Sequence, residues 1–506
     1  MVNGCNGFPE MIPKNRRSNG TDLFRSGETE NVNASLGTDD KPEEACGVFG
    51  IFAPDKDVSR ITYFGLHALQ HRGQESAGIA VADGTSILIY KDMGLVPQVF
   101  DERKLASLQG EIGIGHVRYS TTGVPCWENA QPVHKTYSQG TLALVHNGNL
   151  INSKQLRDEL INGGRRLAST SDTDLVAEKI VWYSNSHIEP AIEKTMKMLK
   201  GAYAILIMTE DRLIAIRDPY GIKPLTLGKI GDDWVVASET CALDIVGATF
   251  ERDIAPGEMV VITKKGIRSK QVLPVEKPSM CVFEFIYFAR PDSYIYDCNL
   301  YDARKNMGIE LAKESSVDAD IVIGMPDSGT PAAIGFAEES KIPFGEGLIK
   351  NRYVGRTFIQ PDQTLRQLGV KMKLNPLRGA IKGKTIVLVD DSIVRGNTCR
   401  QIVSIIKESG AKEVHLRISS PPITYSCYYG IDTDNSDQLI AANKSEEEIR
   451  SFLGADSLSY LSLDGLIKAM GLEKDHFCLA CLNGIYPIPQ TKELSISKRL
   501  LEKEKV

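Results

Sequence analysis

The sequence predicts a two-domain protein, in which an α+β sandwich of sheets and helices is followed by an α/β domain built on a parallel sheet. Three observations support this fold class. The chain has 506 residues, too many for one ordinary core and enough for two domains of about 200 to 250 residues. Short strands separated by turns, with helices between them, run from residue 46 to about residue 272. From about residue 321, β-branched strands alternate with helices, which is typical of a doubly wound parallel sheet.

Apolar spacing and turn residues define the individual elements. Strands are predicted at 46–52, 204–208, 234–238, 321–324 and 385–389. Helices are predicted at 58–71, 153–162, 172–184 and 399–407. The predicted segments of the chain are a polar leader at 1–45, domains at 46–272 and 281–490, a linker near 273–280 and a charged tail at 491–506.

Composition narrows the classes of function. The net charge is −6 and no run of Lys or Arg is present, so we expect small anionic ligands and no nucleic-acid partner. No apolar stretch approaches the roughly 20 residues that span a bilayer, and residues 1–45 lack the apolar core of a secretory signal. We therefore expect a soluble, cytoplasmic protein without a membrane partner. Ten cysteines in such a chain indicate thiols, metal ligands or catalysis rather than a disulfide framework.

A strand, turn and helix at 385–407 predict a site for a phosphorylated sugar. The strand ends in Asp390 and Asp391, whose carboxylates can bind two ribose hydroxyls or a hydrated Mg²⁺. The backbone N–H groups of Gly396, Asn397 and Thr398 lie at the start of the following helix, where they can bind a terminal phosphate. A bare Asp-Asp pair is more often an acidic helix N-terminus after a core strand.

The whole string from Thr385 to Thr398 resembles the ribose-phosphate signature of the type I phosphoribosyltransferases. This resemblance implies an α/β domain with a parallel sheet and one Mg²⁺ ion, bound through Ser328, Asp390 and Asp391. The turn at 324–331 resembles the pyrophosphate loop of that family, with an ordinary turn as the alternative. The segments 350–359 and 366–375 concentrate basic residues that could close over pyrophosphate, with a solvated basic loop as the alternative. The residues that the resemblance assigns to phosphoribosyl diphosphate are Asp327, Ser328, Gly329, Lys350, Arg356, Asp390, Asp391, Ser392, Arg395, Gly396, Asn397 and Thr398.

Cys46 opens an apolar strand, and taken alone it is best interpreted as a buried structural thiol. Its context changes that interpretation. Five segments resemble, in order, those of the N-terminal-nucleophile (Ntn) glutamine amidotransferases, and they lie at 46–50, 71–78, 115–121, 145–150 and 171–174. The resemblance covers residues 46 to about 270 and implies an αββα Ntn-hydrolase sandwich with glutaminase activity.

This resemblance also implies roles for individual residues. Cys46 is the expected nucleophile, and its own α-amine, which titrates near pH 8, is the base once the leader is removed. Asn147 and Gly148 are expected to stabilise the oxyanion, while Arg118 and Asp172 bind the carboxylate and ammonium of glutamine and Arg72 orders the site. Cleavage after Ala45, by the chain itself, is a hypothesis that intact mass tests.

Cys478 and Cys481 have the spacing of a metal-ligand pair, although such a pair is also found in redox sites or simply buried. Cys281 and Cys427 match the remaining cluster cysteines of one subclass of amidophosphoribosyltransferases. Spacing does not separate zinc from iron–sulfur, because both accept four thiolates. Resemblance to the subclass implies one [4Fe–4S] cluster, with a structural role. The other cysteines are predicted to be ordinary thiols, namely Cys5, Cys126, Cys241, Cys298 and Cys399.

Both halves together resemble the amidophosphoribosyltransferase family over residues 46 to about 490. The resemblance implies a glycosyltransferase that passes ammonia from glutamine, along a passage that includes Tyr287, to 5-phosphoribosyl diphosphate. The products are 5-phosphoribosylamine, glutamate and pyrophosphate, in the first committed step of purine synthesis. It also implies feedback inhibition by purine nucleotides and a homotetramer.

Two alternatives have distinct signatures. A glucosamine-phosphate-type synthase shares the first domain but should lack the signature at 387–398. A nucleotide-sensing regulator keeps a phosphate turn without needing a free catalytic cysteine, and the complete glutaminase set disfavours it.

Overall fold

The computed structural model describes residues 46–120, 123–184, 187–351, 374–431, 433 and 436–489. The leader, the tail, Arg356 and most of the two basic segments lie outside the described residues. Within this part of the chain, no helix is long and apolar enough to cross a membrane.

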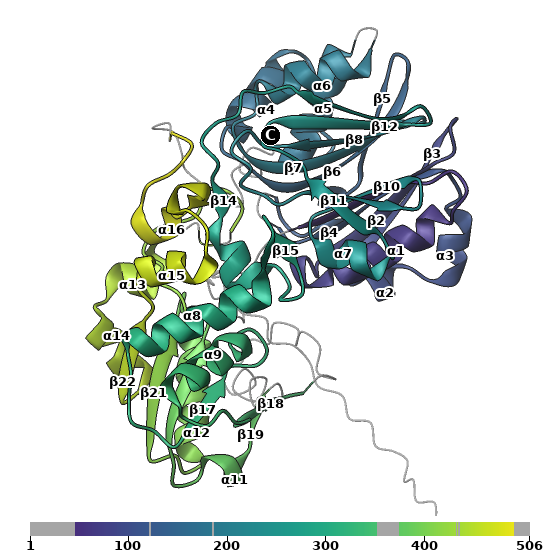
Figure 1. Ribbon diagram of the computed structural model, residues 1–506. Coiled ribbons are helices and arrows are strands. Elements are labelled where there is room, and N and C mark those ends of the chain that lie inside the picture. Colours follow the sequence, from purple (N-terminus) through teal and green to yellow (C-terminus); the bar gives the residue numbers. More distant parts are fainter. Residues whose placement is uncertain are drawn as a thin grey trace, which may run out of the picture. The chain divides into compact units, whose positions relative to one another are not determined.

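The first half contains two antiparallel sheets packed face to face (Figure 1). The seven-stranded sheet runs from edge to edge as β11 (Thr249–Asp253), β9 (Thr226–Ile230), β10 (Asp233–Ala237), β1 (Gly47–Phe52), β4 (Ile112–Arg118), β2 (Ser76–Ala82) and β3 (Ile87–Met93). The six-stranded sheet runs as β13 (Gly266–Gln271), β12 (Glu258–Thr263), β8 (Arg212–Arg217), β7 (Gly201–Met208), β6 (Gly140–Leu150) and β5 (Val133–Tyr137). Between them lies one apolar core, to which β1 contributes Val48 and β6 contributes Val145.

Helices cover the outer faces of both sheets (Figure 1). On the seven-stranded sheet they are α1 (Val58–Ala68), α2 (Val96–Val99), α3 (Glu102–Ser107) and α7 (Thr240–Ile245). On the six-stranded sheet they are α4 (Ser153–Asn162), α5 (Asp172–Tyr183) and α6 (Ile188–Met196). A β-carbon at Gly65 would lie 2.3 Å from Phe49 Cδ2, so glycine lets α1 approach β1. The predicted αββα layering is confirmed.

Short turns complete this half. The predicted helix at 58–71 is instead α1 followed by the 3₁₀ turn η1 (Gln70–Arg72), because the helix ends at Leu69. A second 3₁₀ turn, η2 (Trp127–Asn129), precedes β5.

The second half contains a four-stranded parallel sheet in the order β17 (Ile321–Gly324), β20 (Thr385–Asp390), β21 (Glu413–Ile418) and β22 (Ser457–Tyr460). Successive residues of β20 point to opposite faces: Val387 and Val389 join one apolar cluster, while Ile386 and Leu388 join another. On the first face lie α8 (Leu300–Glu314) and α9 (Thr330–Ser340), and on the second lie α12 (Asn397–Glu408) and α14 (Glu446–Leu453). A sheet covered on both faces explains why its strands are continuously apolar.

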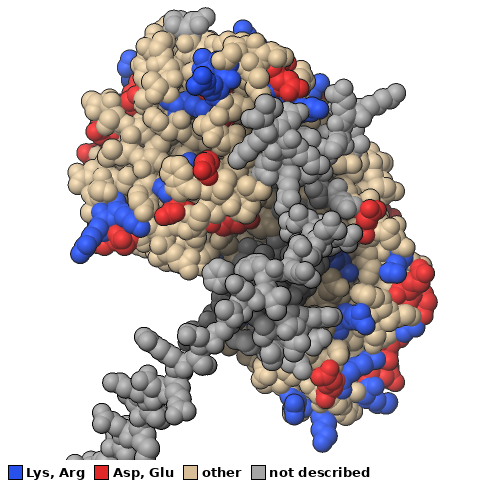
Figure 2. All heavy atoms as spheres, turned by 180° about the vertical axis from the view of Figure 1, so that it is seen from behind, with Lys and Arg blue, Asp and Glu red and all other residues tan. Residues whose placement is uncertain are grey.

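Shorter elements connect these layers. Two-stranded pairs are β14 (Met280–Cys281) with β23 (Phe477–Cys478), β15 (Tyr294–Ile295) with β16 (Cys298–Asn299), and β18 (Leu348–Lys350) with β19 (Leu374–Pro376). The remaining helices and turns are the π-helical turn η3 (Glu284–Phe288), α11 (Arg378–Ile381), η4 (Ser436–Gln438), α13 (Ile440–Asn443), α15 (Leu463–Met470), η5 (Lys474–His476) and α16 (Ala480–Asn483). On the face shown in Figure 2, basic and acidic side chains are interspersed.

Candidate active sites

Cys46 lies directly before β1 and is almost fully buried. Its Sγ donates to the carbonyl oxygen of Tyr119 over 3.3 Å, and its own carbonyl oxygen accepts from Arg72 Nε at 3.3 Å. Gly47 pairs with Val117, which puts Cys46 beside the end of β4 where Arg118 lies. The end of β4 and the side chain of Arg72 therefore fix the position of Cys46.

Asn147 and Gly148 lie on β6, in the other sheet. Asn147 is fully buried, and neither its amide oxygen nor its amide nitrogen has a hydrogen-bond partner among the described residues. A ring nitrogen of His116, on β4, hydrogen-bonds to the carbonyl oxygen of His146 at 3.1 Å. This contact brings Asn147 to the same end of the sandwich as Cys46, with an amide that is available to a reacting group.

Arg118 and Asp172 are both buried. The Arg118 guanidinium donates to Ser120 Oγ at 3.1 Å and to the Gly123 carbonyl at 3.2 Å. Asp172, at the start of α5, accepts from the Leu150 N–H at 3.2 Å and lies 3.6 Å from His146 Nδ1. The strand β6 thus joins Asp172 to Asn147.

Arg72 is 1% exposed. Besides the Cys46 carbonyl, its guanidinium binds Glu239 Oε1 at 2.5 Å and Glu284 at 2.7 and 3.0 Å. These contacts occupy most of its N–H groups, so its contact with the reacting residue is through the Cys46 backbone. Its assignment as a glutamine-binding residue stays a prediction.

Sequence reasoning missed Glu239, Glu284 and His71 as parts of this site. His71 Nε2 lies 2.7 Å from Glu239 Oε1, and burial of Glu239 is outweighed by the charges of His71 and Arg72, which hold the pKa of Glu239 well below its usual range. A single acidic residue between Phe283 and Phe285 is the signal that could have identified Glu284.

Asp390 and Asp391 lie where β20 ends and are 3% and 1% exposed. Asp390 Oδ1 accepts from the Asp391 N–H at 2.9 Å, and Asp391 Oδ1 accepts from Ser392 Oγ at 2.7 Å. Carboxylates at the carboxyl end of a central parallel strand occupy the usual ligand position of such sheets.

The turn after β17 packs against the same strand end. Met325 N–H donates to the Val389 carbonyl at 2.8 Å, and a β-carbon at Gly329 would lie 2.6 Å from that oxygen and 3.2 Å from Asp390 Cα. The structure therefore brings the segment that contains Asp327, Ser328 and Gly329 beside Asp390. Lys350 Nζ lies 2.6 Å from Asp327 Oδ2, so β18 carries a cation to this turn.

Gly396 precedes α12 with φ of 84°, which places Asn397 and Thr398 in the first helical turn. Their N–H groups are at the positive end of a twelve-residue helix that follows the two carboxylates. Arg395 Nε donates to Gln438 Oε1 at 3.0 Å on the surface. Arg356 lies outside the described residues.

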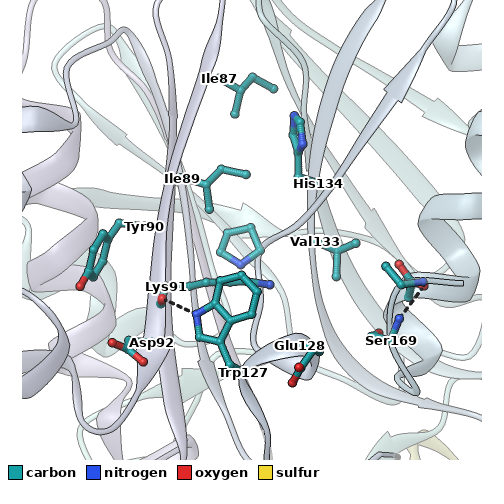
Figure 3. Close-up of a pocket in the computed structure, with 13 residues that line it drawn as sticks. Ile87, Ile89, Tyr90, Lys91, Asp92, Trp127, Glu128, Val133, His134 and Ser169 are labelled. Carbon is teal, nitrogen blue, oxygen red and sulfur yellow. Dashed lines mark hydrogen bonds between the residues drawn. The ribbon is translucent and has the colours of Figure 1, made fainter.

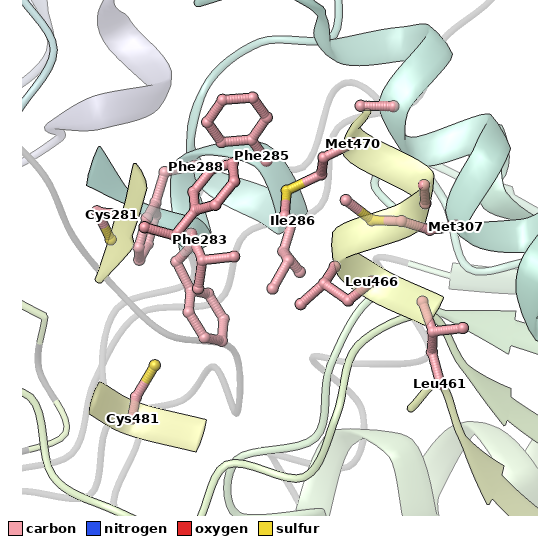
Figure 4. Packing of buried hydrophobic residues seen from close by; sticks show 14 of the residues in the cluster. Cys281, Phe283, Phe285, Ile286, Phe288, Met307, Leu461, Leu466, Met470 and Cys481 are labelled. Atoms are coloured by element: carbon pink, nitrogen blue, oxygen red, sulfur yellow. The ribbon is translucent and has the colours of Figure 1, made fainter. Parts of the chain in front are cut away.

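Four cysteines from distant segments border one apolar cluster. Cys281 on β14 and Cys478 on β23 are direct partners in a parallel pair, and Figure 4 shows Cys281 and Cys481 beside the packed ring of Phe283. Cys427 Sγ accepts from the Tyr429 N–H at 3.4 Å. Burial raises the pKa of Cys281 and Cys481, and that of Cys478 to about 12, and the charges of the other cluster cysteines raise the pKa of each further.

The donor chemistry of these cysteines fits a thiolate-bound metal centre: all four are free of disulfides, Cys281, Cys478 and Cys481 are buried, and the half-buried Cys427 accepts from a backbone N–H. In the described ranges, however, no three or more His, Cys, Asp or Glu side chains are gathered closely enough to hold a metal ion as they stand. The cysteines converge on one region without forming a finished coordination shell.

A pocket of about 610 Å³ lies between β3 and β5 (Figure 3). Trp127, whose indole N–H donates to the Lys91 carbonyl, forms one wall, and Ile87, Ile89 and Val133 supply apolar surface. Cys46, Arg118 and Asn147 do not line it. This cavity is therefore distinct from the environment of the thiol.

Comparisons with known proteins match both halves of the chain. Residues 116–244 match the model of a glutamine amidotransferase domain, and residues 299–419 match that of a phosphoribosyl transferase domain. The amidophosphoribosyltransferase of Synechococcus elongatus is 51% identical over 482 residues, which cover 94% of this chain and 98% of the relative.

Two solved structures share the whole architecture. The glutamine phosphoribosylpyrophosphate amidotransferase from Bacillus subtilis, complexed with ADP and GMP, is 49% identical with a TM-score of 0.84, covering 89% of this chain and 99% of that one. A structure described as the allosteric regulatory enzyme of purine biosynthesis is 50% identical with a TM-score of 0.85, covering 89% and 98%. The chain therefore belongs to the amidophosphoribosyltransferase family, the enzymes that catalyse the first committed step of purine biosynthesis.

Proposed function

We propose that this chain converts glutamine, water and 5-phosphoribosyl diphosphate into 5-phosphoribosylamine, glutamate and pyrophosphate by using the two half-sites in sequence. One observation carries the proposal: a buried thiol near an unpartnered Asn147 amide, and a strand-end carboxylate pair beside a small-residue turn, occur in the same chain. Neither half alone transfers nitrogen from glutamine to a sugar.

In the first half-reaction, the Cys46 thiolate attacks the side-chain amide carbon of glutamine. The amide of Asn147 and the N–H of Gly148 donate to the oxyanion, where preorganised donors contribute most. Ammonia leaves with a proton from the Cys46 α-amine, and water then hydrolyses the thioester to glutamate. Arg118 binds the glutamine carboxylate and Asp172 its ammonium, which fixes the carbonyl against the thiol.

In the second half-reaction, ammonia displaces pyrophosphate from C1 of the sugar. Asp390 and Asp391 hold the ribose hydroxyls, and the N-terminus of α12 with Ser392 and Arg395 holds the 5-phosphate. The turn of Asp327, Ser328 and Gly329, with Lys350 and Arg356, binds the leaving pyrophosphate. Asp390, Asp391 and Ser328 would hold one Mg²⁺ ion together with substrate oxygens, and when bound this ion neutralises charge on the pyrophosphate.

Cys281, Cys427, Cys478 and Cys481 would hold one [4Fe–4S] cluster, which would join the ends of the second domain. Four reduced thiols around one apolar cluster and the N–H of Tyr429 aimed at Cys427 support this assignment. Tyr287, which packs against the same cluster of apolar side chains, contributes to the passage for ammonia.

We also propose further properties, which membership of the family supports. The leader at 1–45 is a propeptide whose removal frees the Cys46 amine, the domains are 46–272 and 281–490, and the enzyme is a cytoplasmic homotetramer. Purine nucleotides inhibit it, which the relative complexed with ADP and GMP supports.

The test measures glutamate and pyrophosphate together in anaerobically purified protein, with glutamine and Mg²⁺, with and without 5-phosphoribosyl diphosphate. Matched release of both products that depends on the sugar diphosphate is the expected result. With glutamine as the nitrogen donor, the variant C46A should release neither glutamate nor pyrophosphate. With ammonium chloride as the donor, it should still release pyrophosphate from the sugar diphosphate. Release of glutamate without pyrophosphate would mean that ammonia goes to a different acceptor. Release of neither product, from protein that lacks its leader, would favour a nucleotide-sensing regulator.

A further inference from the structure

The cavity between β3 and β5 (Figure 3) contains none of the residues assigned to glutamine or to the sugar diphosphate. These two strands are edge strands of the two sheets of the first half. The volume of about 610 Å³ is within the roughly 300 to 1,000 Å³ of small-molecule sites, which are also mostly apolar. The apolar lining consists of Ile87, Ile89, Pro132 and Val133, together with the indole of Trp127. A small ligand with an apolar body therefore fits this cavity.

Lys91, which lines the cavity, is a half-buried cation without a carboxylate partner. Its Nζ donates to the backbone carbonyl of Ala130 and lies 5.0 Å from the centre of the Trp127 ring. No ion pair joins Lys91 to a carboxylate of the described residues. Burial lowers the pKa of Lys91 to about 8, so the amine still carries its charge at neutral pH. A partly buried charge without a counter-ion is unfavourable, and an anionic group in the cavity would reduce that penalty.

The acidic residues of the cavity limit the charge of such an anion. Asp174 is buried and already bound, by Lys135 Nζ at 2.8 Å and by the Ala168 N–H at 2.8 Å. Asp92 and Glu128 are exposed residues of the lining. Their negative charges repel a dianion more strongly than a monoanion. One amine, an apolar lining and these acids together favour a small apolar monocarboxylate.

Hydrogen bonds join the lining of the cavity to the expected glutamine site. Trp127 begins η2 and Asn129 ends it. Asn129 Nδ2 donates to the Val124 carbonyl at 2.8 Å, and the Arg118 guanidinium donates to the same oxygen at 3.4 Å. Arg118 also donates to the Gly123 carbonyl at 3.2 Å. The segment that lines the cavity thus engages the guanidinium that we expect to bind the glutamine carboxylate.

We propose that the cavity between β3 and β5 is a regulatory site for a small apolar monocarboxylate, whose carboxylate binds Lys91 and whose apolar body packs against Ile87, Ile89 and Trp127. The ligand stabilises the described position of η2 and so the backbone carbonyls that engage Arg118. A ligand that favours this arrangement opposes the binding of glutamine. The effect on glutamine rests on the proposed function, whereas binding of the monocarboxylate does not.

Isothermal titration calorimetry with 4-methylpentanoate as the probe measures binding directly. We expect a Kd of about 1 mM or lower, which a ligand of this size can reach. Two comparison probes keep the apolar body and change the charge: 4-methylpentan-1-amine is a cation, and isobutylmalonate is a dianion. Both should bind at least about tenfold more weakly, a difference of about 1.4 kcal/mol. Equal or tighter binding of either one would overturn the assigned class of ligand.

The variant K91M keeps most of the side chain and removes its charge, so we expect it to raise the Kd of the probe about 10- to 100-fold. The variant K91R keeps a cation and should retain most of the binding. Lys104 is the matched control, because its Nζ donates to the Val99 carbonyl at 2.7 Å and lies 4.6 Å from the centre of the Tyr90 ring, but it does not line the cavity. The variant K104M should bind the probe as the wild type does.

Trp127 is 54% exposed, so W127A should fold, and it should also weaken binding. This variant decides the question if K91M does not fold. Absence of saturable binding to the wild type, an unchanged Kd in K91M, or an equal rise of the Kd in K104M would overturn the site.

Kinetics with a saturating concentration of the probe test the regulatory role. The KM for glutamine should rise about fivefold or more, and this rise should disappear in K91M. Pyrophosphate release from ammonium chloride should stay at the level without the probe. An unchanged or lower KM for glutamine would overturn the regulatory role. Failure of the proposed function looks different, because calorimetry would then still detect the probe on a protein that releases no pyrophosphate.

Discussion

The backbone of Gly148 lies so close to the carbonyl oxygen of Ala202 that a β-carbon at position 148 would be 2.0 Å from it. Gly148 also has φ of 145°, a conformation that residues with a side chain rarely adopt. Strands β6 and β7 therefore require glycine here, and this requirement fixes the N–H that we assign to the oxyanion.

The variant G148A should destabilise the fold severely, because it combines backbone strain with a clash against β7. Gly164 is the matched control: its φ is 74° and nothing lies within 4 Å of an added β-carbon. We expect G164A to cost about 1–2 kcal/mol from strain alone, and G148A clearly more. Urea unfolding of both variants measures the difference, and equal midpoints would contradict the role of the Ala202 carbonyl.

The variant N147A should lose activity without losing stability. Removing one oxyanion donor typically lowers kcat by about 10²- to 10³-fold. The amide of Asn147 has no hydrogen-bond partner within the described segments, so its removal from the folded protein abolishes no such bond. Glutaminase assays and thermal unfolding test both statements.

Asn129 is a buried control for that comparison, since its amide donates to Val124 and Thr170 and its oxygen accepts from the Thr170 N–H. N129A should be destabilised by about 1–3 kcal/mol. A larger loss of stability in N147A than in N129A would contradict the assignment of Asn147 as a hydrogen-bond donor that is used only when the oxyanion forms.

The variant D391N should impair the second half-reaction only. A hydrogen bond to a charged group contributes about 1.5–3 kcal/mol, so we expect kcat/KM for the sugar diphosphate, with ammonia as donor, to fall about 10- to 100-fold. Glutaminase activity without the sugar should persist. At the opposite end of β20, Asp320 Oδ2 accepts from the Thr385 N–H at 2.7 Å, so D320N is the control that should leave kcat/KM unchanged.

The variant C481S should abolish the proposed cluster. Its anaerobic purification should yield protein that lacks the iron, inorganic sulfide and visible absorbance of the parent protein. Cys298 packs against the same apolar cluster but donates to the carbonyls of Asn299 and Met470, and C298S should keep the full iron content. Zinc without sulfide in the parent protein would instead identify a Cys₄ zinc site.

His116 should make the folded state sensitive to mild acid. Burial lowers its pKa from 6.5 to about 3, so the folded protein excludes a proton that the unfolded chain binds below about pH 6.5. Its contribution to stability is complete above pH 6.5 and is lost as pH falls toward 3. Between pH 5 and 6.5, H116Q should therefore show a shallower pH dependence of unfolding free energy, by up to about 1.4 kcal/mol per pH unit. Parallel curves would contradict this.

The local parts of the sites were predictable from sequence. The strand at 385–390, its two carboxylates, the turn at Gly396 and the helix at 397–408 are contiguous, and their geometry follows from β-branching, glycine and helix start signals. Cys46 and its strand were equally clear. The order of strands in the sheets, the η3 turn and the division of 58–72 into a helix and a 3₁₀ turn were not predicted, because packing of separate elements decides them.

The sequence by itself determined the chemical groups, the two domains and the family to which they belong. Only the tertiary structure decided that Cys281 and Cys478 lie opposite each other in two parallel strands. It also decided that Asn147 lies at the end of the sandwich where Cys46 lies, and that Arg72 binds both Glu239 and Glu284. The physical reason is that these contacts join residues far apart in the chain. Packed sheets and buried charges bring them together, and local sequence propensities do not determine which distant residues come into contact.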